Sequence, residues 1–229
     1  MMMRHVFAAA FLTAPCAVQA QEFALPEGCT AYLTIQSVSC SVGHHFTCEG
    51  DAPGNQRRVD IGEDGLSYFG MIDSETQWLE STYLGTGHSE FLEDDPADPA
   101  SITELLEIGA NSFDFITNSD EVGPTRYVGA DLLVGETVVI DGVELQRTEY
   151  VIRAENAAGE TMWSSTGQEF ISEEWRMFLS GVGRTEVGDE VFEDDGSPQE
   201  FILPGESGFL SRFPKYGCGI TESSFEVLR

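Results

Sequence analysis

The sequence predicts a mainly β, single-domain protein: an antiparallel, strongly curved sheet of the half-barrel or barrel-like type, with one short helix packed on it. Residues 136–184 form a succession of apolar runs separated by tight turns, and Asp141-Gly142 is the clearest of these turns. Side chains in this stretch alternate with a period of two. The phase of the alternation changes between Leu145 and Thr148, which indicates a β-bulge or bend.

The alternation also predicts which face of the central strands is covered. One face is mostly apolar and the opposite face is charged, as expected for an antiparallel sheet with one covered and one wet side. Long, bent strands of this kind favour a curved sheet over a flat sandwich. The covered face carries Thr148, Tyr150, Ile152 and Ala154, and the wet face carries Glu149, Arg153 and Glu155.

Further strands are expected at residues 31–39, 57–61, 66–72, 77–84, 111–117, 126–129 and 132–134. Two late segments, 187–192 and 199–203, are predicted to pair with each other around an acidic turn.

The one helix expected outside the leader follows Ser101-Ile102-Thr103-Glu104, which has the capping-box pattern. Gly109 occupies the position of a C-terminal cap. The apolar stripe of this short helix is expected to lie against the sheet.

Residues 1–20 have the pattern of a secretory signal peptide: a basic start, a short apolar run, and small residues before a cleavage site after Ala20. The alternative, a lipoprotein signal with Cys16 as the lipidated residue, is disfavoured by Pro15 directly before that cysteine. The remaining 21–229 are then one β-rich domain, of which 219–229 form a flexible tail. This organisation predicts a periplasmic or secreted protein.

The chain is strongly acidic, with 40 Asp and Glu residues against 11 Lys and Arg and a formal net charge of −29. Such a charge repels nucleic acid and anionic lipid surfaces, so neither is an expected partner. The favoured interpretation is a solvated acidic surface. The acidic segments 93–97 and 193–196 lack the spacing of a calcium-binding loop and are expected to be surface loops.

Four cysteines follow the predicted leader, and an even number in an exported chain predicts two disulfides. A turn expected at residues 42–44 would bring Cys40 beside Cys48, which leaves Cys29 to pair with Cys218 and join the two ends of the domain.

A metal site is the alternative for Cys40, His44, His45 and Cys48, because two thiolates and two imidazoles can bind zinc or copper. Exported thiols oxidise, however, and adjacent histidines on an extended segment point to opposite faces. A disulfide with surface histidines is therefore favoured over a metal.

No catalytic motif stands out. The chain has no G-x-S-x-G elbow, HExxH pair, phosphate-binding glycine loop or dinucleotide fingerprint, and no cofactor is predicted. His88, in a glycine-rich segment, is the best candidate for a general base, but a surface position is the favoured interpretation.

We therefore expect a non-enzymatic protein that binds an apolar small molecule, a lipid or a protein segment on the concave face of its sheet. This architecture is similar to the open half-barrels of periplasmic lipid and lipoprotein carriers and to lipocalin-like barrels, an analogy that no motif carries. The alternatives are a hydrolase using a carboxylate with His88, and a structural envelope protein. The residues expected to line the binding face are Tyr150, Ile152, Trp163, Trp175 and Met177.

Overall fold

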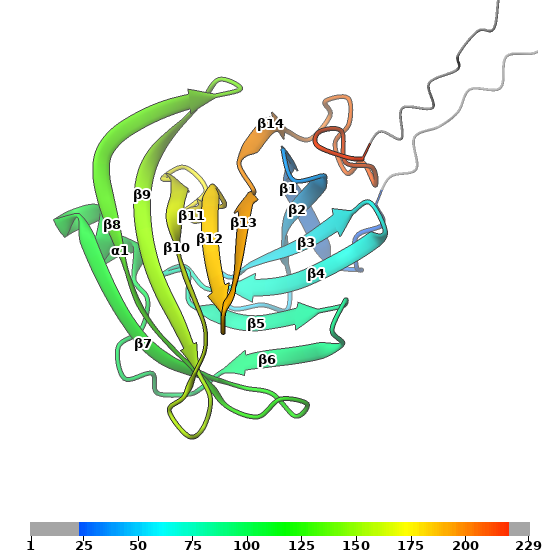
Figure 1. Ribbon diagram of the computed structural model, residues 1–229. Helices are drawn as coiled ribbons and strands as arrows, with labels where there is room; N and C mark the ends of the chain where they lie inside the picture. Colours follow the sequence, from blue (N-terminus) through cyan, green and yellow to red (C-terminus); the bar gives the residue numbers. More distant parts are fainter. Residues whose placement is uncertain (1–22, 220–229) are drawn as a thin grey trace, which may run out of the picture.

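The computed structural model describes residues 23–219 and confirms a mainly β protein with one antiparallel sheet and one short helix (Figure 1). The predicted signal peptide and residues 220–229 of the predicted tail lie outside the described part. The elements are β1 (Cys29–Ser37), β2 (Ser41–Cys48), β3 (Gln56–Gly62), β4 (Gly65–Ile72), β5 (Trp78–Tyr83), β6 (His88–Leu92), α1 (Ile102–Ile108), β7 (Ala110–Asn118), β8 (Thr125–Ile140), β9 (Val143–Glu155), β10 (Thr161–Ser172), β11 (Met177–Leu179), β12 (Val182–Val187), β13 (Glu190–Asp195) and β14 (Pro198–Ile202).

All 14 strands belong to one sheet, in the order β13-β12-β10-β9-β8-β7-β6-β5-β4-β3-β2-β1-β14, with β11 paired to β10. Because β13 and β14 stand at opposite ends of this order, the predicted pairing of residues 187–192 with 199–203 is wrong. The first segment is divided by a turn into the end of β12 and the start of β13, with Val187 opposite Glu190. The second pairs with β1, with Phe201 opposite Ile35.

The central meander follows the sequence prediction closely. Asp141 and Gly142 both have positive φ, 49° and 81°, as a two-residue turn between β8 and β9 requires. The predicted irregularity is also present. Leu133 lies opposite Thr148 and Thr137 lies opposite Gln146, so β8 contributes the extra residues of the bulge.

Helix α1 begins at the expected cap, where the Ser101 side chain accepts a hydrogen bond from the Glu104 amide, and ends at Gly109 in the left-handed conformation. The reciprocal bond of a capping box is not made, because the Glu104 carboxylate accepts from Asn111 instead. Ile102 and Leu105 are buried against Ile171 of β10, so the apolar stripe does face the sheet.

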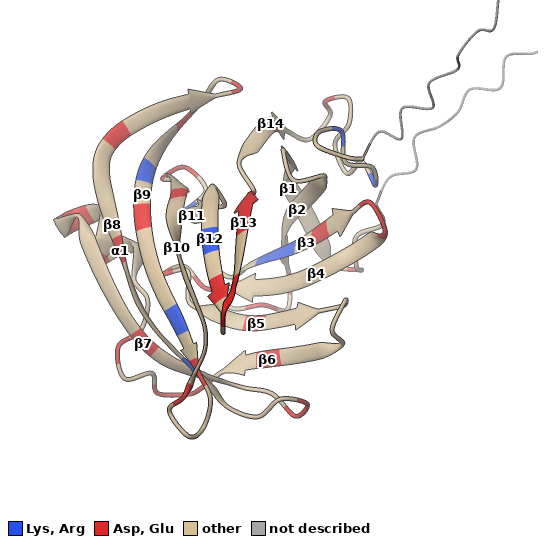
Figure 2. Ribbon diagram, in the orientation of Figure 1, with Lys and Arg blue, Asp and Glu red and all other residues tan. Residues whose placement is uncertain are grey.

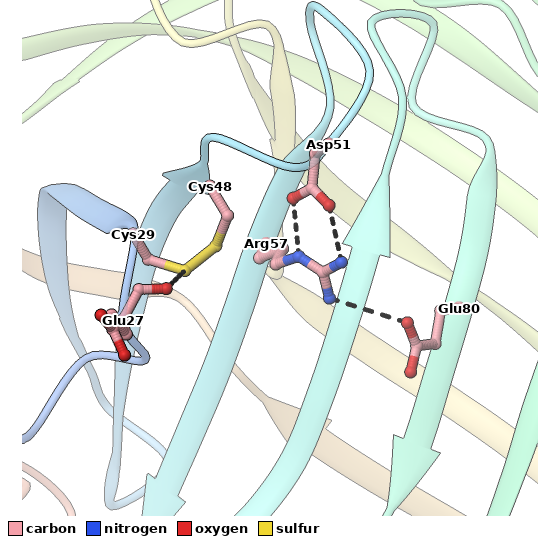
Figure 3. The surroundings of a disulfide bond; sticks show 6 residues. All are labelled: Glu27, Cys29, Cys48, Asp51, Arg57 and Glu80. Carbon is pink, nitrogen blue, oxygen red and sulfur yellow. Dashed lines mark hydrogen bonds and ion pairs between the residues drawn. A yellow bond between two sulfur atoms is a disulfide. The ribbon is translucent and has the colours of Figure 1, made fainter.

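The disulfide pairing predicted from the sequence is wrong. Cys29 bonds to Cys48, and Cys40 bonds to Cys218. The cause is the position of the first hairpin turn, which lies at 38–40 rather than at 42–44 and places Cys29 directly opposite Cys48 at the open end of β1 and β2. Figure 3 shows this disulfide beside Arg57, whose guanidinium donates two hydrogen bonds to Asp51 at 2.7 Å.

Strands β1–β4 share one covered face, and strand β1 is covered on its other face as well. On one face the polypeptide segments 23–28 and 203–218 lie over a cluster containing Ala31, Phe46 and Val59. On the other face Leu33 and Ile35 pack with residues of β9, β10, β11 and β14. Strands β3–β6 run across the direction of β8–β10 in Figure 1. Residues of β1, β9 and β10 belong to one apolar cluster, so parts of the sheet far apart in strand order contribute to one interior.

Candidate binding cavity

A cavity of about 660 Å³ lies within this interior, bordered by residues of β2–β5 and of β7–β13. Its volume is in the range of small-molecule sites, which are commonly 300–1,000 Å³. The strand registers place its lining side chains in layers, because residues directly opposite each other on neighbouring strands share a level and a face.

One layer of the cavity is aromatic. Phe115, Tyr127 and Ala154 lie opposite one another on β7, β8 and β9, and Trp163 lies opposite Ala154 on β10. Trp78 of β5 meets this layer from the facing strands, with its ring edge-on to Phe115 at 5.6 Å and to Tyr127 at 5.4 Å. Aromatic edges and faces arranged in this way suit an apolar or aromatic ligand.

The next layers along the same strands are polar. Asp131 of β8 lies directly opposite Tyr150 of β9, and Glu169 of β10 lies two residues beyond Gly167, which is opposite Tyr150. Arg58 of β3 reaches the cavity from the facing strands. Its guanidinium lies 3.2 Å from the Asp60 carboxylate and 4.8 Å from the centre of the Tyr68 ring.

Burial shifts the titration of these carboxyls. It raises the pKa of Asp131 to about 7, and it raises the pKa of Glu169 to about 8 with a further contribution from the charge of Asp131. Nearby Arg58 acts in the opposite direction on Glu169. Burial and the charge of Arg58 lower the pKa of His45, another lining residue, to about 3, so its imidazole is neutral.

Glycines lie beneath three of the rings that border the cavity. A Cβ built on Gly70 would lie 2.3 Å from the Tyr68 hydroxyl, and a Cβ on Gly129 would lie 2.5 Å from the Phe113 ring. The Tyr150 ring lies against Gly167 in the same way. Because a glycine has no side chain, each ring can lie flat against the backbone of the sheet and does not fill the cavity.

The structure places four of the five predicted ligand-binding residues at the cavity: Tyr150, Ile152, Trp163 and Met177. Trp175 lies elsewhere. It belongs to the turn between β10 and β11, and its ring packs on Phe201 with 5.5 Å between ring centres. The period-two alternation therefore indicated the face of β9 and β10 that lines the cavity. It did not apply to Trp175, because the alternation is lost in the turn after β10.

Sequence analysis missed the polar residues of the cavity, Arg58, Asp131 and Glu169. A signal was present for two of them. Asp131 is in phase with the buried Tyr127, and Glu169 is in phase with Trp163 and Ser165, so each carboxyl stands at an inward-facing position of its strand. A charged residue at such a position marks a polar interior site.

His88 lies in a small hydrogen-bonded network. Its Nδ1 is 2.8 Å from the Thr86 hydroxyl and its Nε2 is 3.2 Å from Glu90. Glu90 is buried and also accepts hydrogen bonds from Thr117 and Tyr127, at 2.6 and 2.9 Å. This network ties β6 to β7 and β8, and the His88 ring stacks on Tyr83.

The histidines of the Cys40–Cys48 segment are not on the surface, contrary to the prediction. His44 is fully buried and bonds to Thr34 at 3.0 Å, whereas His45 faces the cavity. The expectation that they point to opposite faces is confirmed. Both neighbouring cysteines are used in disulfides, and no group of three or more potential metal ligands occurs within 23–219.

Comparison with known proteins gives no match: no family model, no curated protein and no solved structure resembles this chain closely enough to be assigned. In the part of the chain that the structure describes, the single helix is too short to cross a membrane.

Proposed function

We propose that this protein is an exported, non-enzymatic binding protein that holds a small, largely apolar ligand in the hollow of a curved, half-barrel sheet. The observation that carries the proposal is the 660 Å³ cavity with its aromatic layer. Side chains from strands at both ends of the sheet order line the same space, which supports a sheet curved around it. Two disulfides support an oxidising, periplasmic or secreted location.

A small ligand is favoured over a lipid chain or a protein segment by the shape of the lining. The cavity alternates aromatic and charged layers over a few residues of each strand, whereas an acyl chain requires a continuous apolar surface. The acidic surface also disfavours docking on anionic lipid. Figure 2 shows acidic residues along much of β13, at the edge of the sheet.

Mass spectrometry of the protein purified from its native extract tests this function directly. We expect a stoichiometric small molecule that is released on unfolding. The substitution Ile152→Trp is expected to fill the cavity and abolish the co-purified mass, while the control Val151→Trp, on the exposed face of the same strand, retains it. A native protein that carries nothing and binds no apolar fluorescent probe would rule out the carrier function.

A hydrolase is the second candidate, and the observation in its favour is the hydroxyl–imidazole–carboxylate sequence Thr86, His88, Glu90. Against it, His88 does not border the cavity, and Glu90 already accepts two structural hydrogen bonds. Loss of a measured hydrolytic activity in His88→Ala would favour this alternative.

A further inference from the structure

We propose that the ligand carries a cationic head, an amine on an apolar or aromatic body, and that the ammonium group lies beside Asp131 and Tyr150 with Glu169 as its second carboxylate. This inference rests on the proposed binding function and specifies its ligand class. It is argued from four features of the cavity: an unpartnered buried carboxyl, a second carboxyl on the same face, the charge balance, and the adjacent aromatic layer.

The first feature is Asp131. Only 8% of the residue is exposed, its side chain borders the cavity, and it has no hydrogen-bond partner among residues 23–219. An ionised carboxyl in such a place is destabilised unless a donor or cation accompanies it. The raised pKa of Asp131 has the same origin, because burial destabilises its ionised form. An ammonium group supplies both the charge and the donors that Asp131 lacks.

The second feature is Glu169, which lies on the same face two strands away. Strand spacing and rise place the two Cα atoms about 12 Å apart. That span accommodates both side chains and one ammonium group between them. Glu169 likewise has no hydrogen bond to another described residue, and the charge of Asp131 contributes to its raised pKa. A bound cation would relieve the repulsion between the two carboxylates.

The charge balance of the cavity favours a cation over an anion. Arg58 is paired with Asp60, and Arg57 is paired with Asp51 and Glu80. His45 is neutral, and the remaining charged lining residues, Asp131, Glu169 and Asp194, are all acidic.

Arg58 shows how this cavity already accommodates a cation. Its guanidinium lies over the Tyr68 ring with the Asp60 carboxylate beside it. Asp131 and Tyr150 are directly opposite each other on neighbouring strands and offer the same combination of carboxylate and aromatic ring. In this second place no cation from residues 23–219 is present.

The aromatic layer sets the position of the body of the ligand. Ile152 and Phe113 lie one level along the strands from Tyr150 and Asp131, and Trp163 lies one level further. A ligand whose amine is separated from an aromatic or branched apolar group by one or two bonds therefore fits both layers.

Three probes with one common body test the inference: 1-naphthylmethylamine, 1-naphthylmethanol and 1-naphthoate, titrated by calorimetry at neutral pH. We expect the amine to bind at least about tenfold more tightly than the alcohol, as one or two charge-assisted hydrogen bonds imply, and the carboxylate not to bind. Asp131→Asn and Glu169→Gln should each weaken the amine about tenfold and leave the alcohol unchanged.

Glu149→Gln is the matched control, because Glu149 is an exposed residue of β9 and its substitution removes the same charge from the opposite face. Equal weakening by this control would reduce the effect to net charge and overturn the inference. So would an alcohol or carboxylate that binds as tightly as the amine, although those results would leave the binding function standing.

If none of the three probes binds, the ligand class is overturned, and the binding function is decided separately by the co-purification experiment. Calorimetry in two buffers of different ionisation enthalpy gives an independent readout. Between about pH 5.5 and 7, where Asp131 and Glu169 of the free protein still hold protons, amine binding should release protons from the protein, and Asp131→Asn should reduce that release. Binding of the amine without proton release would contradict its placement beside Asp131 and Glu169.

Discussion

Strands β1–β4 and strands β8–β10 are parts of one sheet, yet they are stabilised differently. The first group has one face covered by polypeptide segments, borders the cavity with the other face of β2–β4, and is tied by two disulfides. The second also has one face on the cavity, but its other face exposes apolar residues such as Val139 and Val151, and these strands contain no disulfide among the described residues. The first group therefore provides a cross-linked part of the cavity wall, and the second provides a part without disulfides that carries Asp131 and Glu169.

The disulfides test how far cross-links stabilise β1–β4 and should show the largest effect. Cys40–Cys218 closes a loop of 178 residues, and Cys29–Cys48 closes one of 19. In the chain-entropy model these loops correspond to roughly 5 and roughly 3 kcal/mol. We expect Cys40→Ser with Cys218→Ser to destabilise more than Cys29→Ser with Cys48→Ser, measured by urea unfolding under oxidising conditions. The opposite ranking would show that strand pairing already holds the C-terminal segment in place.

Glycine substitutions compare the two groups at the cavity. In Gly129→Ala the new Cβ would lie 2.3 Å from the Val151 carbonyl oxygen, a backbone atom that cannot move freely. In Gly70→Ala the contact is with the Tyr68 side chain, which can turn into the cavity. We expect Gly129→Ala to cost about 3 kcal/mol and Gly70→Ala about 1 kcal/mol, by thermal and urea unfolding. Only Gly70→Ala should yield a well-folded protein with impaired ligand binding.

Buried titratable side chains in the two groups of strands give opposite pH dependences. The raised pKa values of Asp131 and Glu169 mean that the folded protein retains protons that the unfolded chain has lost, so stability falls as pH rises toward 8. Burial lowers the pKa of His44 to about 4 and of His45 to about 3, so stability falls as pH drops below 6.5.

The two trends offset each other between about pH 4.5 and 6.5, which predicts a plateau of stability there, followed by a decrease of about 2 kcal/mol by pH 8. Urea unfolding at a series of pH values measures both the plateau and the decrease in the free energy of unfolding. The double substitution Asp131→Asn, Glu169→Gln should abolish the decrease above pH 6.5. It should also replace the plateau with a fall in stability as the pH drops from about 6.5 to 4.5, because the effect of His44 and His45 is then no longer offset. If the decrease persists, it arises from the surface charge rather than from the cavity.

Features of the fold that depend on adjacent residues could be predicted from the sequence. Asp141-Gly142 and Ser101 are local signals, since the conformation of a turn or cap depends on a few adjacent residues, and both were located correctly. The first hairpin turn was misplaced because its left-handed residue is Cys40, with a φ of 53°, and not a glycine that would have indicated a turn. That error of a few residues led to the wrong disulfide pairing.

The candidate site was only half predictable for a related reason. Alternation along β9 identifies Tyr150 and Ile152 as inward-facing, but the layers of the cavity depend on registers between strands. Arg58 and Glu169 come from β3 and β10, which are distant in both sequence and strand order. No period within one strand can show that they share an interior.

The smallest predicted effect concerns a contact that joins the two parts. Glu75, between β4 and β5, accepts hydrogen bonds from Ser101 and Thr103 at the start of α1, and Arg176, beside β11, lies 3.2 Å from the same carboxylate. Hydrogen bonds from Thr103 and Ser101 and the charge of Arg176 lower the pKa of Glu75 against the opposing effect of burial. Because Glu75 and Arg176 are about one-third exposed, the ion pair should contribute only about 1 kcal/mol.

A double-mutant cycle of Glu75→Gln and Arg176→Met isolates that contribution, and it should vanish as pH falls below the lowered pKa of Glu75. Hydrogen exchange should then show whether the contact couples the two parts of the sheet. We expect faster exchange in both the 73–77 loop and β11 of either single variant, while β1 and β2 remain protected. Faster exchange on one side alone would mean that the contact anchors a loop and does not join the two regions.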